Sequence, residues 1–211
     1  MADPARCQLY LTTPPELVSG GVLLRDFLPK LEAAFDAADI ACVLIAAPEG
    51  CTDEALSAIA DPLIEAVQRR DAAALLDGRP ELAKQLNADG AHLDLRVRDT
   101  DSALRAYRHA RKILGADAVV GVLCAAERHA AMEIAEADAD YIGFDLAAPE
   151  TENVIAWWGE VMTVPCVAFG AIDPSLGKAL ARSGADFLAP EPSIWRDSDP
   201  VDAVRKLADH R

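Results

Sequence analysis

The sequence alternates eight times between a short apolar run and a longer stretch with helical periodicity. The short runs are rich in Val, Ile, Leu and Ala, as buried strands are. They cover residues 8–12, 40–46, 72–76, 90–95, 118–123, 141–146, 165–169 and 186–189. The helical stretches cover residues 24–38, 52–70, 80–87, 100–114, 126–137, 150–162, 174–183 and 199–210. We therefore predict eight consecutive strand–helix units.

Continuous strand–helix alternation is typical of an α/β fold with a parallel sheet covered by helices. Eight units fit a closed (β/α)8 TIM barrel. No linker or change of composition divides the 211 residues, so we expect one domain over residues 1–211. The alternative is an open, doubly wound sheet, which often carries a G-x-G-x-x-G motif after its first strand. No such motif follows residues 8–12, and this favours the barrel.

Three similar turns join a predicted helix to the next strand. They are residues 87–90 (NADG), 137–140 (ADAD) and 183–186 (SGAD). Glycine or a small polar residue at such a place lets a helix end and the chain reverse. In a barrel these turns lie at the end opposite the site, so we predict a structural role for them.

The charge balance restricts the partners of this chain. Lys and Arg number 20 against 35 Asp and Glu, giving a formal net charge of −15. Such a surface repels nucleic-acid phosphates and anionic lipids, so we expect neither nucleic acid nor a membrane as partner. The five cysteines form no C-x-x-C pair, and we see no signal peptide, so we expect a cytoplasmic protein with reduced thiols. A homo-oligomer stays open.

Acidic residues stand at the upper ends of three predicted strands, where TIM barrels carry their sites. Asp77, Asp94 and Asp145 offer carboxylate oxygens of the kind that Mg²⁺ prefers. The alternative is that they cap the helices that follow, where the helix dipole favours negative charge. On the first interpretation, Asp77 and Asp94 are the candidate metal ligands.

A histidine and two arginines complete the candidate site. His92 shares a strand face with Asp94, so the two are candidates for acid–base catalysis, or His92 is a core residue bonded to a neighbour. Arg79 and Arg96 follow two strands and are candidates to bind a phosphate or carboxylate in a fork. The alternative for both arginines is pairing with surface acids.

Several segments, in chain order, resemble those of thiamine phosphate synthases and the related thiazole tautomerases. Each segment alone is weakly specific, but the ordered set spans almost the whole chain. The segments are QLYLT at 8–12, ADGAHL at 88–93, ADYIGF at 139–144, PCVAFGAI at 165–172, GADF at 184–187 and SIWRDSDPVDA at 193–203.

The resemblance implies a TIM barrel enzyme of thiamine biosynthesis with its site at the carboxyl ends of the strands. Such a transferase joins an aminopyrimidine methyl pyrophosphate to a thiazole phosphate and releases pyrophosphate. It implies Mg²⁺ as cofactor, no organic cofactor, and a phosphorylated heterocycle as the small-molecule partner. It also implies a catalytic role for Arg79 and phosphate contacts at Arg79, Gly170 and Ser193. We add Arg96, Gly143, Asp145 and Ala171 as candidate phosphate- or substrate-binding residues.

The sequence departs from the family at the positions that hold metal and pyrophosphate. Residues 43–50 and 147–153 lack the family's basic side chains, and Gly78 and Val97 stand where the family has ligating aspartates. Because the departure of pyrophosphate needs cations on its oxygens, these changes weaken the prediction of efficient synthase chemistry. We expect a less basic mouth, with Arg79 and Arg96 as its main cations.

Three functions stay open at this point. The first is a divergent synthase with eroded metal and pyrophosphate motifs. The second is a catalytically silent barrel that binds or senses a thiamine precursor. The third is a different enzyme acting on a phosphorylated small molecule, since one fold hosts many chemistries.

Overall fold

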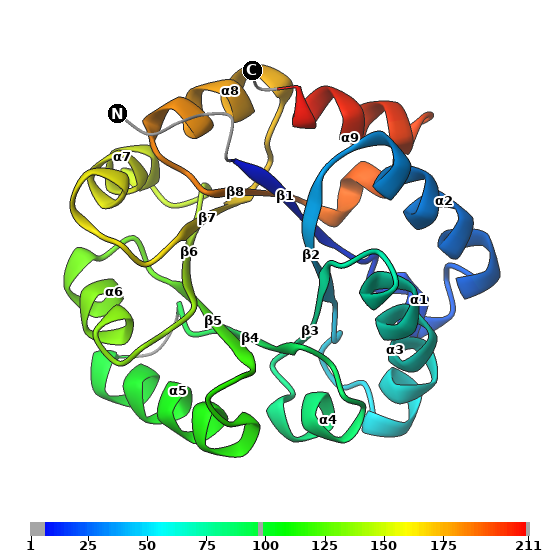
Figure 1. Cartoon of the computed structure of the whole chain (residues 1–211), viewed down its shortest axis with the longest axis horizontal. Coiled ribbons are helices and arrows are strands. Elements are labelled where there is room, and N and C mark those ends of the chain that lie inside the picture. The colour runs from blue at the N-terminus through cyan, green and yellow to red at the C-terminus, as the bar shows by residue number, and fades with distance from the viewer. Residues whose placement is uncertain (1–6, 97–98, 210–211) are drawn as a thin grey trace.

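The computed structural model describes residues 7–96 and 99–209, and its eight parallel strands close into a barrel (Figure 1). The last strand pairs with the first, with Gln8 opposite Phe187. The predicted (β/α)8 barrel is confirmed, and the open-sheet alternative is wrong. The strands are β1 (Gln8–Thr12), β2 (Ile40–Ile45), β3 (Ala73–Asp77), β4 (Gly90–Asp94), β5 (Val119–Cys124), β6 (Tyr141–Asp145), β7 (Cys166–Gly170) and β8 (Phe187–Pro190).

A ring of helices covers the outside of the barrel, and each bound lies within two residues of the predicted one. Aspartate or threonine caps help to set these starts; Asp173, for example, accepts from the backbone N–H of Leu176 at 2.8 Å. The helices are α2 (Leu24–Ala37), α3 (Asp53–Gln68), α4 (Pro80–Gln85), α5 (Thr100–Leu114), α6 (Arg128–Ala135), α7 (Thr151–Val161), α8 (Pro174–Ser183) and α9 (Pro200–Ala208). None of the helices in the described ranges is both long and apolar enough to cross a bilayer.

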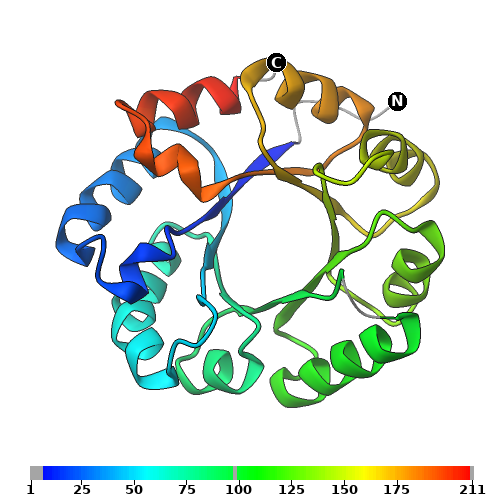
Figure 2. The same ribbon diagram turned by 180° about the vertical axis from the view of Figure 1, so that it is seen from behind.

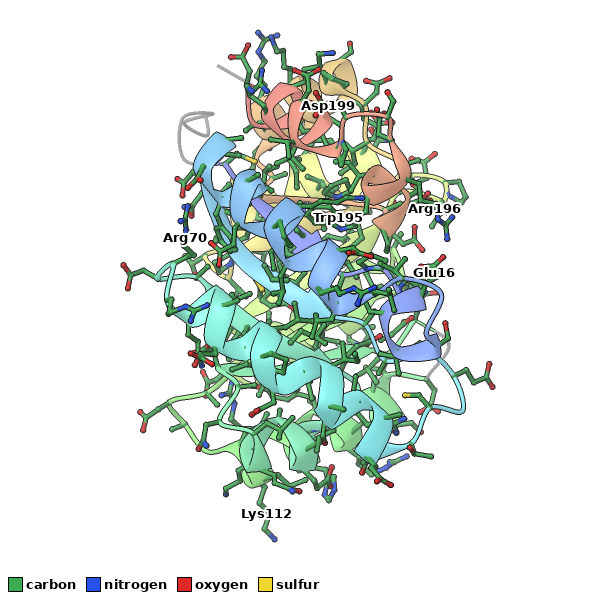
Figure 3. The ribbon with its side chains drawn as sticks, turned by 90° about the vertical axis from the view of Figure 1, so that its right-hand side faces the viewer. Glu16, Arg70, Lys112, Trp195, Arg196 and Asp199 are labelled. Carbon is green, nitrogen blue, oxygen red and sulfur yellow. The ribbon has the colours of Figure 1, made fainter. Side chains whose placement is uncertain are left out.

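Two short helices were not predicted, because four or five residues show no periodic pattern. They are α1 (Glu16–Ser19), after β1, and η2 (Pro192–Arg196), after β8. In Figure 2 the orange η2 lies next to the end of the dark-blue β1, from which the chain continues into α1, and Glu16 of α1 and Arg196 of η2 form an ion pair (Figure 3). The indole N–H of Trp195 donates to the carbonyl of Thr12 at 2.8 Å, which ties η2 to the end of β1.

The three similar turns have the structural role that the sequence predicts. Asp89 accepts from the backbone N–H of Ala74 in β3 at 2.8 Å, and Asp186 accepts from that of Cys166 in β7 at the same distance. Asp140 accepts in the same way from Val120 in β5. Each aspartate thus binds the chain at the start of the neighbouring strand, which explains why the motif recurs.

Aromatic side chains fill the inside of the barrel at the positions that glycines leave free. A Cβ at Gly121 would lie 1.9 Å from the ring of Tyr141, and one at Gly143 would lie 2.7 Å from the ring of Phe169. Tyr10 packs on both rings, with centroid distances of 5.7 Å to Tyr141 and 5.2 Å to Phe169. These glycines are therefore required by packing rather than by backbone conformation.

We predict that Gly121→Ala lowers the free energy of unfolding by about 3 kcal/mol, because the interior is already filled and the Tyr141 ring must be displaced. Urea unfolding measures this loss. Gly78→Ala is the control: Gly78 has open space around its Cα and a φ of 63°, so only backbone strain of about 1 kcal/mol is expected. An equal loss in the two variants would contradict the packing argument.

Candidate active site at the barrel mouth

The carboxyl ends of the strands surround a cavity of about 260 Å³, which we call the mouth cavity. Six of the predicted site residues line it, contributed by β3, β4, β6 and β7 and the turn after β4. They are Asp77, His92, Asp94, Arg96, Asp145 and Gly170. The other lining residues are Thr12, Leu44, Leu123, Phe169, Ala189, Pro190, Glu191 and Pro192.

Arg96 connects the ends of β4 and β6 across this cavity. Its Nε lies 2.9 Å from Oδ1 of Asp94 and its Nη2 lies 2.7 Å from Oδ2, so it holds Asp94 in a fork. Its Nη1 donates to Asp145. Burial alone would raise the pKa of Asp94, but the bonds from Arg96 outweigh it and lower the pKa. Asp94 and Asp145 are therefore partners of one guanidinium.

Asp77 is the third carboxylate of the mouth cavity and differs from the other two. Burial at the end of β3 raises its pKa from 3.8 to about 6, and the negative charge of Asp94 adds to the increase. A backbone hydrogen bond from Ala47 and the charges of Arg79 and Arg96 oppose it. The predicted capping role of Asp77 is absent from α4, where Arg79 is the N-cap without a side-chain bond.

His92 forms part of the floor of the mouth cavity and is 2% exposed. Its Nδ1 lies 2.7 Å from the hydroxyl of Tyr141, which lies 2.8 Å from the hydroxyl of Tyr10. Burial lowers the pKa of His92 to about 4, so the imidazole is neutral at pH 7. The structure thus gives His92 and Asp94 different partners, and acid–base work by this pair stays a prediction.

The sequence analysis missed Tyr10 and Tyr141. Each stands in an otherwise apolar strand, and a buried tyrosine hydroxyl needs a hydrogen-bond partner. That requirement was a usable signal, because two such tyrosines and His92 all belong to predicted strands. The hydrogen-bond partners of these three side chains depend on the register between strands. The residue pattern does not give that register.

Arg79 lies outside the lining of the mouth cavity. Its Nη2 donates to the carbonyl of Cys51 at 3.3 Å, and its Nε lies 3.6 Å from the carboxylate of Asp53 at the start of α3. Gly143 lies within β6 against Phe169. The predicted catalytic role of Arg79 and substrate contact of Gly143 stay predictions.

Ala171 and Ser193 line a second hollow, which we call the outer groove. It has a volume of about 570 Å³ and shares Pro190 and Glu191 with the mouth cavity. Lys206 also lines it, with five acidic residues: Asp173, Glu191, Asp197, Asp199 and Asp202. The predicted phosphate contacts at Ala171 and Ser193 therefore lie in acidic surroundings.

The residues of the mouth do not fit a magnesium site in this arrangement. Among residues 7–96 and 99–209, no three His, Cys, Asp or Glu side chains are grouped so as to hold a metal ion. Both oxygens of Asp94 already accept from Arg96. The metal site predicted on Asp77 and Asp94 therefore has no support in this arrangement and stays only a prediction from the sequence. Val97 lies outside the described residues.

Comparison with known proteins agrees with the sequence resemblance. The sequence model of a family described as thiamine monophosphate synthase matches residues 9–191. A thiamine-phosphate synthase of Rhodospirillum centenum is 38% identical over 96% of this chain and 95% of that protein. One of Erythrobacter litoralis is 35% identical over 96% and 94%.

Solved structures agree on the fold. The thiamine phosphate pyrophosphorylase of Pyrococcus furiosus superposes with a TM-score of 0.77 over 98% of this chain and 96% of that chain. Its sequence identity is 18%, so this likeness concerns the fold alone.

We predict that Asp77→Asn stabilises the protein at about pH 8 by about 2 kcal/mol, because it removes a buried carboxylate with a raised pKa. The folded protein holds a proton on Asp77 between about pH 4 and pH 6, whereas the unfolded chain releases it. Wild-type stability therefore falls as the pH rises through this window, and the advantage of the variant disappears below it. Urea unfolding at both ends of the window measures the difference.

The matched control for this prediction is Asp101→Asn, on the exposed first turn of α5. We expect a change of less than about 0.5 kcal/mol, with no such pH window. A difference between Asp77→Asn and wild type that stays constant with pH would contradict the buried-carboxylate argument.

Proposed function

This chain belongs to the thiamine monophosphate synthase family, and from that premise we propose that it is a thiamine-phosphate synthase with altered charges at its mouth. The observation that carries the proposal is the 38% identity to a thiamine-phosphate synthase over nearly the full length of both chains. The mouth cavity is the proposed site, because TIM barrel enzymes place their chemistry at this end of the strands.

The proposed reaction joins two heterocycles. A bond forms between the thiazole nitrogen and the methylene carbon of the aminopyrimidine. The bond from that carbon to the pyrophosphate oxygen breaks, and its electron pair leaves with the pyrophosphate. A cation near those oxygens lowers the barrier, and Arg96 is the cation that lines the mouth cavity.

Arg96 retains the capacity to bind an anion. Three of its N–H groups donate to Asp94 and Asp145, and a guanidinium has five. Its side chain is 40% exposed, so the remaining two can reach a phosphate oxygen. Asp77, Asp94, Asp145 and Glu191 line the same cavity, and their charges oppose a polyanion more strongly than a monoanion. We therefore propose that a monophosphate binds better here than pyrophosphate.

A second candidate is a barrel that binds or senses a thiamine precursor without catalysis. The specific observation that favours it is the charge of the mouth cavity. Four carboxylates and one guanidinium are among its lining residues, and the guanidinium is shared between two of the carboxylates.

We predict that the protein forms thiamine phosphate from the aminopyrimidine methyl pyrophosphate and the thiazole phosphate. The assay follows product by chromatography, with and without added Mg²⁺. The rate should fall at least about tenfold in Arg96→Ala, since one charged hydrogen bond to the leaving group is lost. Product no higher than in a protein-free control would reject the synthase. Calorimetric binding of thiamine phosphate would then support the silent barrel.

We also predict that Arg96→Ala weakens the binding of thiamine phosphate about tenfold, whereas Arg79→Ala changes it less than about threefold. The reason is position: Arg96 lines the mouth cavity, and Arg79 is held beside Asp53. Calorimetric titration measures both affinities. A larger loss in Arg79→Ala would show that the sequence analysis placed that residue correctly and that the mouth extends toward α3.

A further inference from the structure

A line of polar groups crosses the otherwise apolar interior of the barrel. Tyr10 from β1, Tyr141 from β6 and His92 from β4 are joined by hydrogen bonds of 2.8 and 2.7 Å. Leu44, Leu75, Val167 and other apolar side chains surround the tyrosines. Buried polar groups of this kind must satisfy one another, so the direction of each bond is fixed by its neighbours.

The protons in this line have one favoured arrangement. A neutral imidazole nitrogen is a stronger acceptor than a phenol oxygen, and a phenol is a stronger donor than an imidazole N–H. Tyr141 therefore donates to Nδ1 of His92, and Tyr10 donates to Tyr141. If instead His92 donated to Tyr141 and Tyr141 donated to Tyr10, the Tyr10 hydroxyl would have to donate to the neighbouring buried thiol of Cys42. Sulfur is a weak acceptor, so this order is less favourable.

We infer that Tyr141, supported by Tyr10, is a positioning residue that fixes the His92 tautomer, so that Nε2–H faces the mouth cavity and binds an acceptor atom of an aromatic ring. The bond at one ring nitrogen decides which nitrogen carries the proton. Nδ1 bonds Tyr141 at the interior side, and His92 lines the mouth cavity. The nitrogen left for a ligand is Nε2.

The surroundings of His92 suit a flat, uncharged ring. The ring of Phe169 lies 5.1 Å from that of His92, and Leu44, Leu123 and Ala189 also line the mouth cavity. A volume of about 260 Å³ accommodates one substituted heterocycle. The ligand class is therefore a nitrogen heterocycle with an in-plane lone pair.

The identity of the ring rests on the proposed function. In the joining reaction the thiazole nitrogen uses its lone pair to attack carbon, so a hydrogen bond to it would oppose the reaction. The ring nitrogens of the aminopyrimidine keep their lone pairs throughout. We therefore assign the acceptor to a ring nitrogen of the aminopyrimidine.

The first test reads the tautomer directly. Long-range ¹H–¹⁵N spectra of the labelled protein show the imidazoles of its four histidines, and the signals lost in His92→Gln identify His92. We expect a protonated Nε2 and an unprotonated, hydrogen-bonded Nδ1 in the wild type. In Tyr141→Phe, where Nδ1 loses its donor, part of the population should shift to the Nδ1–H tautomer, so the Nδ1 and Nε2 signals should move toward each other. A protonated Nδ1 in the wild type would overturn the inference without any ligand.

The second test reads the ligand contact. The probes are 4-amino-5-hydroxymethyl-2-methylpyrimidine and its two pyridine counterparts, each of which lacks one ring nitrogen. We expect one pyridine to bind about tenfold more weakly than the pyrimidine, as the loss of one hydrogen bond predicts. His92→Gln keeps an N–H donor at a similar reach and should retain the discrimination, whereas His92→Asn should lose it.

The outcomes separate this inference from the proposed function. Equal binding of all three probes by the wild type, no binding of the pyrimidine, or discrimination that persists in His92→Asn would overturn the ring contact. A failed synthase assay together with the expected tautomer and discrimination would reject the enzyme and leave the ring contact supported. Product formation in the synthase assay together with equal binding of the three probes would support the enzyme and reject the ring contact.

Discussion

The pairing of β1 with β8 is the interaction on which the site depends. It brings the carboxyl ends of all eight strands to one rim, so residues far apart in the chain meet there. Without closure, Tyr10 on β1 and Tyr141 on β6 would have no reason to share an interior. Trp195 strengthens the same junction, because its indole bonds Thr12 beside the last strand.

The polar line inside the barrel bears both on stability and on the recognition that we infer for His92. Three hydrogen-bonding side chains are buried there, and each would destabilise the core if its partner were absent. Gly121 makes room for Tyr141, so the packing of one strand decides where the hydroxyl of another lies. The neutral imidazole at the end of this line is a consequence of burial, since burial disfavours its charged form.

The charged side chains at the rim of the barrel pair mainly with one another. Arg96 is paired with Asp94 and Asp145 instead of standing alone, and the pKa of Asp77 is raised by burial and by the nearby charge of Asp94. The result is a mouth whose cation is tied to the protein's own carboxylates. In the proposed function, an incoming phosphate competes with these bonds or adds to them.

The sequence by itself determined the eight strand–helix units, the barrel and the family, because hydrophobic period and short motifs are local properties of the chain. It also placed Asp77, His92, Asp94, Arg96, Asp145 and Gly170 at the ends of strands, and these do line one cavity. Only the tertiary structure decided which side chains form hydrogen bonds or ion pairs with one another. Arg96 joins Asp145, His92 joins Tyr141 and Arg79 turns to Asp53, because register and side-chain direction between distant strands depend on closure and packing.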